Sequence, residues 1–455
     1  MAKRWLCLLL AAALVLMLGG CSFAAFDAKT LMAPPKANED QQAIYKLLRG
    51  NLPDVTFLYP KTGEYRSAIV MQDFTGDGVE DAIGFTSLGD TGGARVQFLV
   101  KQDGKWETAA AFQNSAIQID RVCFADFSGR GCQDVLIGWG STSGTSGRTA
   151  AANVYLYEDG EVTEHSLGVY GELALTDFNR DGVSEVFTVD KFLPAETEED
   201  EPTPAAARVY SYNGFSMKER YIAAADNSIA SYQSAVFGRL TQTMWGVALD
   251  GAKADGSVTT QIFYLKDNAL INAPEGVNTE EYTNQFTRPS AASFLSRDIN
   301  GDGIIELPSV TLLPGISEDV TPDSTSFLVE WRRWQKGGGS LLAARVLLNV
   351  GENYWFRLPH QMEGKITASN DAARRTVTYT RVTRSEETDE PLLGETLFSI
   401  RVFTRAAWES RGESGGYEML SMQNDLVYGM QVRTFDPEMI KYINEIKQSF
   451  SLLSE

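Results

Sequence analysis

Short apolar runs dominate the chain between residues 55 and 350. Typical examples are AIVMQ, ARVQFLV and DVLIGW, which are rich in β-branched and aromatic residues and are separated by turns containing Gly, Asp or Asn. Runs of this length and composition predict strands rather than helices. Glycine is abundant and long helical periodicity is rare. The pattern therefore predicts a mainly β protein.

Helical periodicity occurs near the two ends of the chain. Residues 38–48 predict one helix, with Ile44 on its apolar side. From residue 351 the strands alternate polar and apolar positions, and the chain ends in a second helical pattern. Asp436 can cap that helix and Pro437 suits its first turn. Residues 351–455 are therefore predicted to form a small α+β domain, and the core side of its helix comprises Met439, Ile440, Ile443, Ile446 and Phe450.

One acidic segment recurs four times in phase with the strands. It reads DFTGDGVED (loop 1, from Asp73), DFSGRGCQD (loop 2, from Asp126), DFNRDGVSE (loop 3, from Asp177) and DINGDGIIE (loop 4, from Asp298). The first three lie about 50 residues apart, and the last gap is about twice as long. A degenerate unit at 234–250 has the strand pattern without the loop and fills that gap.

A period of this size with several strands per unit predicts β-propeller blades. About five units fit between residues 65 and 350, and a sixth would include the strand at 55–60. The predicted architecture is thus a propeller of about five to six blades over residues 38–350, followed by the α+β domain.

The acidic loops offer oxygen ligands at alternate positions. Calcium takes six to eight oxygens, and a Gly allows the sharp turn that such a loop needs. The two His residues are far apart, and loops 1, 3 and 4 offer neither sulfur nor imidazole, which disfavours zinc and copper. The alternative is a tight polar turn held by its own hydrogen bonds. The predicted ligands of structural calcium are Asp73, Thr75, Asp77, Val79 and Asp81, then Asp177, Asn179, Asp181, Val183 and Glu185, and finally Asp298, Asn300, Asp302, Ile304 and Glu306.

Loop 2 departs from this pattern. Arg130 stands where the other loops have an acidic residue, and its guanidinium would repel a divalent ion and could pair with Asp126 or Asp134 instead. Cys123 and Cys132 occupy positions that are apolar in the other repeats. Either they form a disulfide in an oxidising compartment, or they are two buried thiols.

The first 21 residues combine a basic start with an apolar run that is too short to be a good membrane-spanning helix. The run ends in LGGC, which resembles the lipobox of bacterial lipoproteins. That resemblance implies a signal peptide over residues 1–20, lipidation of Cys21 with diacylglycerol and fatty-acyl chains such as palmitate, and a tether over residues 21–37. The protein would then be extracytoplasmic, on the cell surface, and held to the cell membrane by its lipid. The alternative is an ordinary signal peptide.

The repeats resemble FG-GAP or VCBS repeats, which occur in integrin α subunits and in many bacterial surface proteins. Residues 30–350 further resemble repeat-bearing lipoproteins of clostridia-type bacteria. This resemblance implies a propeller fold and a surface location, but no settled biochemical activity.

Charge and motif content narrow the functional classes. Acidic residues outnumber basic ones, 60 against 40, so nucleic acid is not expected as a partner. The phased carboxylates belong to turns and leave no distinguished acid–base pair, so no catalytic residue is predicted. Trp331 and Trp334 in EWRRWQ either stack on sugar or lie in a strand, one on each face.

A non-enzymatic binding or scaffold module with a protein or polysaccharide ligand is therefore the first hypothesis. A carbohydrate-active or envelope-processing enzyme on a propeller scaffold is the alternative. A third hypothesis is a role in envelope assembly without a small ligand.

Overall fold

The structure is a computed structural model of the 455-residue chain. It describes residues 39–50, 55–89, 92–140, 150–195, 197, 201–273, 286–290, 294–316, 325–337, 339–385, 387–388, 390–411 and 415–453. Within these ranges, no helix is long and apolar enough to cross a bilayer. The predicted signal peptide, Cys21 and the tether lie outside the described residues.

Four consecutive sheets have four antiparallel strands each, in sequence order. The first sheet comprises β1 (Ile69–Gln72), β2 (Asp81–Ser87), β3 (Ala94–Gln102) and β4 (Lys105–Asn114), and the second β5 (Gln118–Ala125), β6 (Asp134–Gly140), β7 (Ala150–Glu158) and β8 (Glu161–Tyr170). The third comprises β9 (Glu172–Thr176), β10 (Glu185–Asp190), β11 (Ala206–Tyr212) and β12 (Met217–Ala224), and the fourth β13 (Ile229–Arg239), β14 (Trp245–Lys253), β15 (Val258–Lys266) and β16 (Ala269–Ala273).

The fifth sheet closes with a strand from the end of the chain. Its order is β17 (Glu306–Leu312), β18 (Ser326–Gln335), β19 (Gly339–Asn349), β20 (Tyr354–Arg357) and β26 (Ser451–Leu452). The fifth sheet thus extends past the predicted boundary at residue 350. The degenerate unit forms β13 and β14 without an acidic loop, as the sequence predicts.

Consecutive sheets pack face to face, which explains why their central strands are apolar on both sides. In β6, Val135 belongs to the core between the first and second sheets, whereas Leu136 belongs to the core between the second and third. Phe187 and Val247 continue this packing between the third and fourth sheets. Each internal sheet therefore buries both faces against its neighbours.

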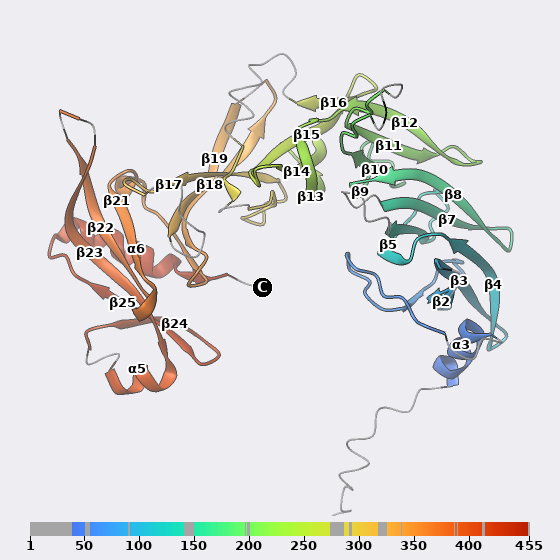
Figure 1. The fold of residues 1–455 in the computed structure, drawn as a ribbon, viewed down its shortest axis with the longest axis horizontal. Coiled ribbons are helices and arrows are strands. Elements are labelled where there is room, and N and C mark those ends of the chain that lie inside the picture. Colours follow the sequence, from blue (N-terminus) through green and yellow to red (C-terminus); the bar gives the residue numbers. More distant parts are fainter. Residues whose placement is uncertain are drawn as a thin grey trace, which may run out of the picture.

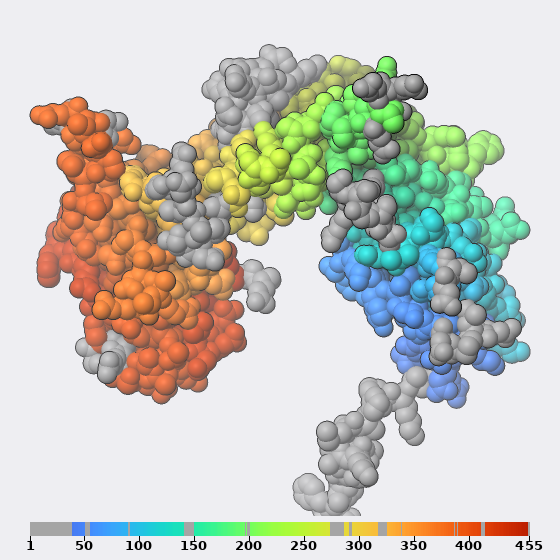
Figure 2. Space-filling model, viewed as in Figure 1, coloured from blue at the N-terminus to red at the C-terminus, as the bar shows by residue number. Residues whose placement is uncertain are grey.

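The sheets follow one another along an arc (Figure 1). The mainly β prediction is confirmed, and the units with several strands are sheets of four or five strands. The described sheets do not close into a ring, and the space-filling view shows a wide gap between the first sheet and the C-terminal part (Figure 2). The segment at 55–60 does not begin an additional blade, because the amide of Leu58 donates to the carbonyl of Phe85 in β2.

The predicted N-terminal helix is present as α3 (Glu39–Arg49) and covers the free face of the first sheet. Ile44 and Leu48 are buried against Leu99 and Trp106 of that sheet. The indole of Trp106 also donates to Asp40 over 2.8 Å. The helix thus acts as a cap at one end of the stack.

The C-terminal module contains the sixth sheet and two helices. The sheet order is β21 (Ile366–Asp371), β22 (Thr376–Arg384), β23 (Pro391–Thr404), β25 (Leu426–Val432) and β24 (Glu418–Gln423), with α5 (Arg405–Arg411) and α6 (Pro437–Ser449). Short 3-10 turns lie at η4 (His360–Met362) and η5 (Ala372–Arg374).

The predicted C-terminal helix is confirmed as α6. The Asp436 side chain caps it by accepting from the amide of Glu438. Ile443 and Ile446 are fully buried, in a core that also contains Tyr354 of the fifth sheet and Tyr379 of the sixth. The two tyrosine hydroxyls are hydrogen-bonded over 2.8 Å, which joins the module to the stack.

Candidate functional site

The four acidic loops share one hydrogen-bonded framework. The amide of the sixth residue, always Gly, donates to a carboxylate oxygen of the first Asp. The distances are 2.9 Å in loop 1, 2.7 Å in loop 2, 3.2 Å in loop 3 and 2.7 Å in loop 4. The four glycines have φ between 77° and 87°, a region that disfavours other residues. The repeat predicted from the sequence is therefore a repeat of structure.

Loops of neighbouring sheets contact one another. A Cβ placed on Gly76 of loop 1 would lie 2.9 Å from the Cβ of Cys132 in loop 2. A Cβ on Gly129 of loop 2 would lie 3.2 Å from Val183 in loop 3. The amide of Ser184 also donates to the Asp126 carbonyl over 2.7 Å. The loops therefore line one side of the stack and join consecutive sheets.

Loop 1 contains four carboxylates, and three of them, Asp73, Asp77 and Asp81, are predicted ligands. Asp81 is 1% exposed, and its Oδ2 accepts from the amide of Thr75 over 3.1 Å. Burial raises the pKa of Asp81 above its ordinary value, and the charge of Asp77 adds to this effect. A neighbouring cation would stabilise the charged form of Asp81 and so lower its pKa.

Loop 3 brings together three carboxylates, one of them buried. Glu185 is 7% exposed beside Asp177 and Asp181. Burial, together with repulsion from these two carboxylates, raises the pKa of Glu185 to about 7, although the amide of Phe178 and the charge of Arg220 act in the other direction. The guanidinium of Arg180, a residue of the loop itself, instead lies over the Trp245 ring, 4.0 Å from its centroid.

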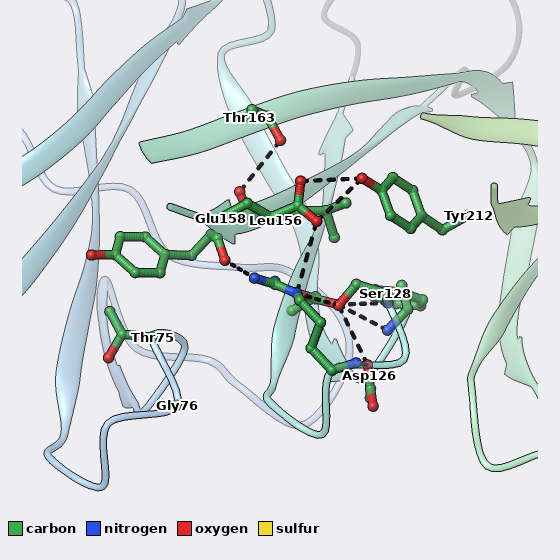
Figure 3. A network of polar contacts seen from close by, with 12 residues as sticks. Thr75, Gly76, Asp126, Ser128, Leu156, Glu158, Thr163 and Tyr212 are labelled. Atoms are coloured by element: carbon green, nitrogen blue, oxygen red, sulfur yellow. Dashed lines mark hydrogen bonds and ion pairs between the residues drawn. The ribbon is translucent and has the colours of Figure 1, made fainter. Parts of the chain in front are cut away.

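Loop 2 is built around Arg130, and Figure 3 shows Ser128, Glu158 and Tyr212 of the polar network to which it belongs. Its Nη2 lies 2.9 Å from Oδ1 of Asp134, and its Nε donates to Oγ of Ser128 over 2.9 Å. The same guanidinium reaches Glu158 on β7, which accepts from the Tyr212 hydroxyl of the third sheet. The predicted pairing of Arg130 with Asp134 is confirmed.

Loop 4 receives a guanidinium from the neighbouring strand. Arg333 of β18 lies directly across from Glu306, and its Nε is 3.0 Å from Oε1 of that carboxylate. Its Nη2 donates to Asp302. The side chain of Glu306 is fully buried, so this ion pair is shielded from solvent on the carboxylate side. The sequence analysis missed Arg333, because only the register of β17 against β18 brings it to the loop.

As the loops stand, their carboxylates turn towards backbone amides. Across the described residues, no group of three or more His, Cys, Asp or Glu side chains is arranged to hold a metal ion. The donor set is nevertheless one that suits calcium: in loop 3 Asp177, Asn179, Asp181 and Glu185 would hold the ion, together with the Val183 carbonyl. Loop 1 offers Asp73, Thr75, Asp77, Asp81 and the Val79 carbonyl.

The two cysteines contact different surroundings. The structure describes both thiols as free. Cys123 packs in the core between the second and third sheets, whereas Cys132 faces Gly76 of loop 1. Burial raises the pKa of Cys123 to about 11. Both cysteines are half-buried, and the disulfide between them stays a prediction.

A second candidate site lies on the fifth sheet, on the face that points away from the fourth. Phe327, Val329, Trp331, Val346 and Leu348 form its apolar floor. Above this floor lies a cavity of about 350 Å³, which is also lined by Arg297, Arg357 and Trp355. Its floor contains no charged residue, whereas both arginines at its edge are exposed.

The two tryptophans predicted to be strand residues lie in β18, one on each face. Trp331 belongs to the floor of the open face, and Trp334 packs against Tyr264 between the fourth and fifth sheets. Each is 3% exposed. Neither ring therefore offers a free surface on which a sugar could stack. The sequence analysis missed the open face itself, because no local pattern shows which sheet is last in a stack.

Comparison with known proteins adds little. No family model and no curated protein matches the sequence. Among solved structures, the crystal structure of the exotype rhamnogalacturonan lyase YesX matches with a TM-score of 0.30 and 9% identity, covering 72% of this chain and 77% of that one. At that TM-score the likeness carries no argument about fold or activity. What the described residues define is a mainly β protein of stacked antiparallel sheets.

Proposed function

We propose that this protein is a lipid-anchored, extracytoplasmic binding module without enzymatic activity. Its repeats are propeller-type blades of the FG-GAP or VCBS kind, and calcium in the acidic loops stabilises their stacking. The lipid on Cys21 holds the module at the cell membrane. The open face of the fifth sheet binds a protein partner.

The observation that carries this proposal is the open face. Every other junction in the stack covers the equivalent face with the next sheet, as Phe187 and Val247 illustrate. On the fifth sheet, the same position is taken by a cavity above Val329 and Val346. Val329 and Val346 are 1% and 8% exposed, because Phe294 and Leu453 already pack against this face. A partner would therefore fill the cavity that remains rather than cover a bare sheet. A partner would thus continue the packing that already holds the sheets together.

The chemistry of the rim indicates what kind of partner fits. Arg297 and Arg357 line the cavity together with Asp298, and neither arginine forms an ion pair with another described residue. These two cations stand out in a chain of net charge −20. The floor is apolar, and the indole of Trp331 within it is 3% exposed, which leaves that ring no free surface for a sugar. We therefore assign the face to a protein segment that combines apolar side chains with flanking carboxylates.

Site-specific photo-crosslinking in intact membranes tests this assignment. A crosslinking amino acid replaces Ala344, which lines the cavity, and in a control it replaces Ile222, which is exposed on β12. We expect an adduct from Ala344 alone. Arg357→Glu should abolish that adduct, whereas Arg374→Glu, on an exposed arginine of η5, should leave it intact.

The outcomes separate the alternatives. An adduct that survives Arg357→Glu, or one that forms equally from position 222, would contradict the assignment. An adduct between two copies of this chain would replace the partner by a homodimer. Binding to a glycan array, lost on Arg357→Glu, would favour the polysaccharide alternative instead.

The lipid anchor has its own test. Cys21→Ser should abolish incorporation of a metabolic fatty-acid probe and release the protein from the membrane fraction, because the thiol is the predicted site of lipidation. Cys123→Ser is the matched control and should retain the probe. Equal labelling of the Cys21→Ser protein would refute the anchor.

A further inference from the structure

Two of the four acidic loops contain a guanidinium among their carboxylates. In loop 2 it belongs to Arg130, the fifth residue of the loop, and lies 2.9 Å from Asp134. In loop 4 it belongs to Arg333 of β18 and lies 3.0 Å from Glu306. Asp134 and Glu306 are both the ninth residue of their loop. One arginine comes from the loop and the other from a neighbouring strand, yet both meet the same carboxylate position.

These carboxylates are the ones that a bound cation would need. The side chains of Asp134 and Glu306 are fully buried, and each already accepts from a guanidinium. In loop 4, Asp302 is also held by Arg333. A divalent ion at the same oxygens would lie within a few ångströms of a permanently charged guanidinium, and it would have to displace that group.

Loops 1 and 3 differ in this respect. Among the described residues, no Lys or Arg forms an ion pair with Asp73, Asp77 or Asp81, and none does so with the carboxylates of loop 3. The arginine that loop 3 contains, Arg180, is directed at Trp245. Loop 1 therefore keeps four carboxylates, and loop 3 keeps three, that form no ion pair with another described residue.

We infer that arginine has taken the place of the cation in loops 2 and 4, and that only loops 1 and 3 bind calcium. This inference rests on the proposed calcium stabilisation and removes Asp298, Asn300, Asp302, Ile304 and Glu306 from the predicted ligands. It divides the acidic loops into two kinds. Loops 2 and 4 are held permanently by an arginine of their own sheet, and loops 1 and 3 respond to the calcium concentration outside the cell.

The number of bound calcium ions tests the inference directly. Equilibrium dialysis of the full-length chain in mild detergent, with radiolabelled calcium, should give two ions per chain. Arg333→Met removes the guanidinium but keeps the length of the side chain, and should raise the number to three. Arg332→Met, on the same strand but paired with Glu330, should leave it at two.

A second pair of variants does not depend on how Arg333→Met folds. Asp181→Asn should lose one ion, because Asp181 belongs to loop 3. Asp302→Asn should lose none. Three ions in the unmodified chain, with one lost on Asp302→Asn, would overturn the inference while leaving calcium binding in place. A chain that binds no calcium, with or without the substitutions, would overturn both the inference and the calcium proposal.

Discussion

Glu330 is a half-buried carboxylate between two arginines of the fifth sheet. Its Oε1 accepts from Nε of Arg345 over 2.8 Å, and its Oε2 accepts from Nε of Arg332 over 2.9 Å. Burial alone would raise the pKa of Glu330, but the hydrogen bonds and charges of the two guanidinium groups bring it below the ordinary value of 4.5. The charged form of Glu330 is therefore stabilised in the folded state.

The sign of the pH dependence follows from this shift. A carboxylate whose pKa is lower in the folded state contributes stability above its unfolded pKa, and that contribution is lost as the pH falls through the folded pKa. Glu330→Gln should lower the free energy of unfolding at pH 7 by about 2 kcal/mol. That is less than the 3–5 kcal/mol of a fully buried pair, because the side chain of Arg332 is 25% exposed.

Urea unfolding at neutral and acidic pH measures this effect. The Glu330→Gln protein should lose less stability on acidification than the unmodified chain does. Glu107→Gln, on an exposed residue of β4, is the control and should change neither value. An unchanged acid response in Glu330→Gln would show that the ion pair adds nothing to stability.

The two cysteines yield a second prediction for single residues. Because the thiol of Cys123 is buried and its pKa is raised to about 11, it should resist alkylation in the folded protein. Denaturing without reductant should expose two reactive thiols beyond Cys21. Mass spectrometry after alkylation counts them, and a count of none would establish the disulfide between Cys123 and Cys132.

Single residues were predictable where the signal is local. The loops were found because Asp, Gly and a carboxylate recur at fixed spacing, and the Arg130 pairing follows from one position of that pattern. Arg333 could not be found in this way. It lies 27 residues beyond Glu306 in the sequence, and it meets that carboxylate only through strand register. Register depends on turn geometry and sheet packing, which one sequence does not reveal.

At the scale of elements, α3 illustrates how a short helix can terminate a sheet stack. Leu48 is 1% exposed and lies over Gly84, where a Cβ would come within 2.3 Å of the leucine methyl groups. Glycine at this position of β2 lets the helix approach the sheet closely. The contact between Leu48 and Gly84 therefore sets the position of α3 on the first sheet.

Leu48→Ala should destabilise the protein by about 2–5 kcal/mol, because it leaves a cavity under a helix that cannot collapse onto the sheet. Lys46→Ala, on the exposed side of α3, should cost less than about 0.5 kcal/mol. Chemical denaturation of the two variants measures the difference. A cost for Leu48→Ala as small as that for Lys46→Ala would mean that the helix is not needed as a cap.

Elements with strong periodicity were predictable, whereas their partners were not. Helix α6 follows its sequence signals closely, since Asp436 caps it and its apolar stripe is buried. The segment at 55–60 was a candidate strand of a sixth blade, yet Phe57 forms an isolated bridge to Thr86 of β2 in the first sheet. The apolar pattern of this segment predicts that it pairs with a strand, but it does not indicate which strand. For the same reason, the sequence did not predict that β26 pairs with β20 in the fifth sheet.

At the scale of the whole molecule, the stack is held together by the interfaces between consecutive sheets. Each sheet shares a core with the next, and contacts such as Ser184 with Asp126 also join the loops. In such an arrangement the total stability is close to a sum over units and junctions. The repeat could be predicted from the sequence. The opening of the arc could not, because it depends on the angle between successive sheets rather than on any one of them.

Calcium should therefore raise the melting temperature of the whole stack, although each site contributes modestly. Extracellular calcium sites typically have dissociation constants of about 10⁻⁴–10⁻³ M. Ligand at ten times the dissociation constant adds roughly 1.4 kcal/mol per site, and two such sites should raise the melting temperature by roughly 2–5 °C. Chelator should reverse this rise.

Scanning calorimetry of the unmodified chain and two variants measures that response. Asp181→Ala should remove about half of it, because it deletes a central carboxylate of loop 3 without disturbing the core. Arg130→Ala should lower the melting temperature by losing its bond to Asp134, yet leave the calcium response nearly unchanged, since loop 2 keeps only two carboxylates. A melting temperature indifferent to millimolar calcium and to chelator would mean that the loops are polar turns, held together by the amide hydrogen bonds that all four share.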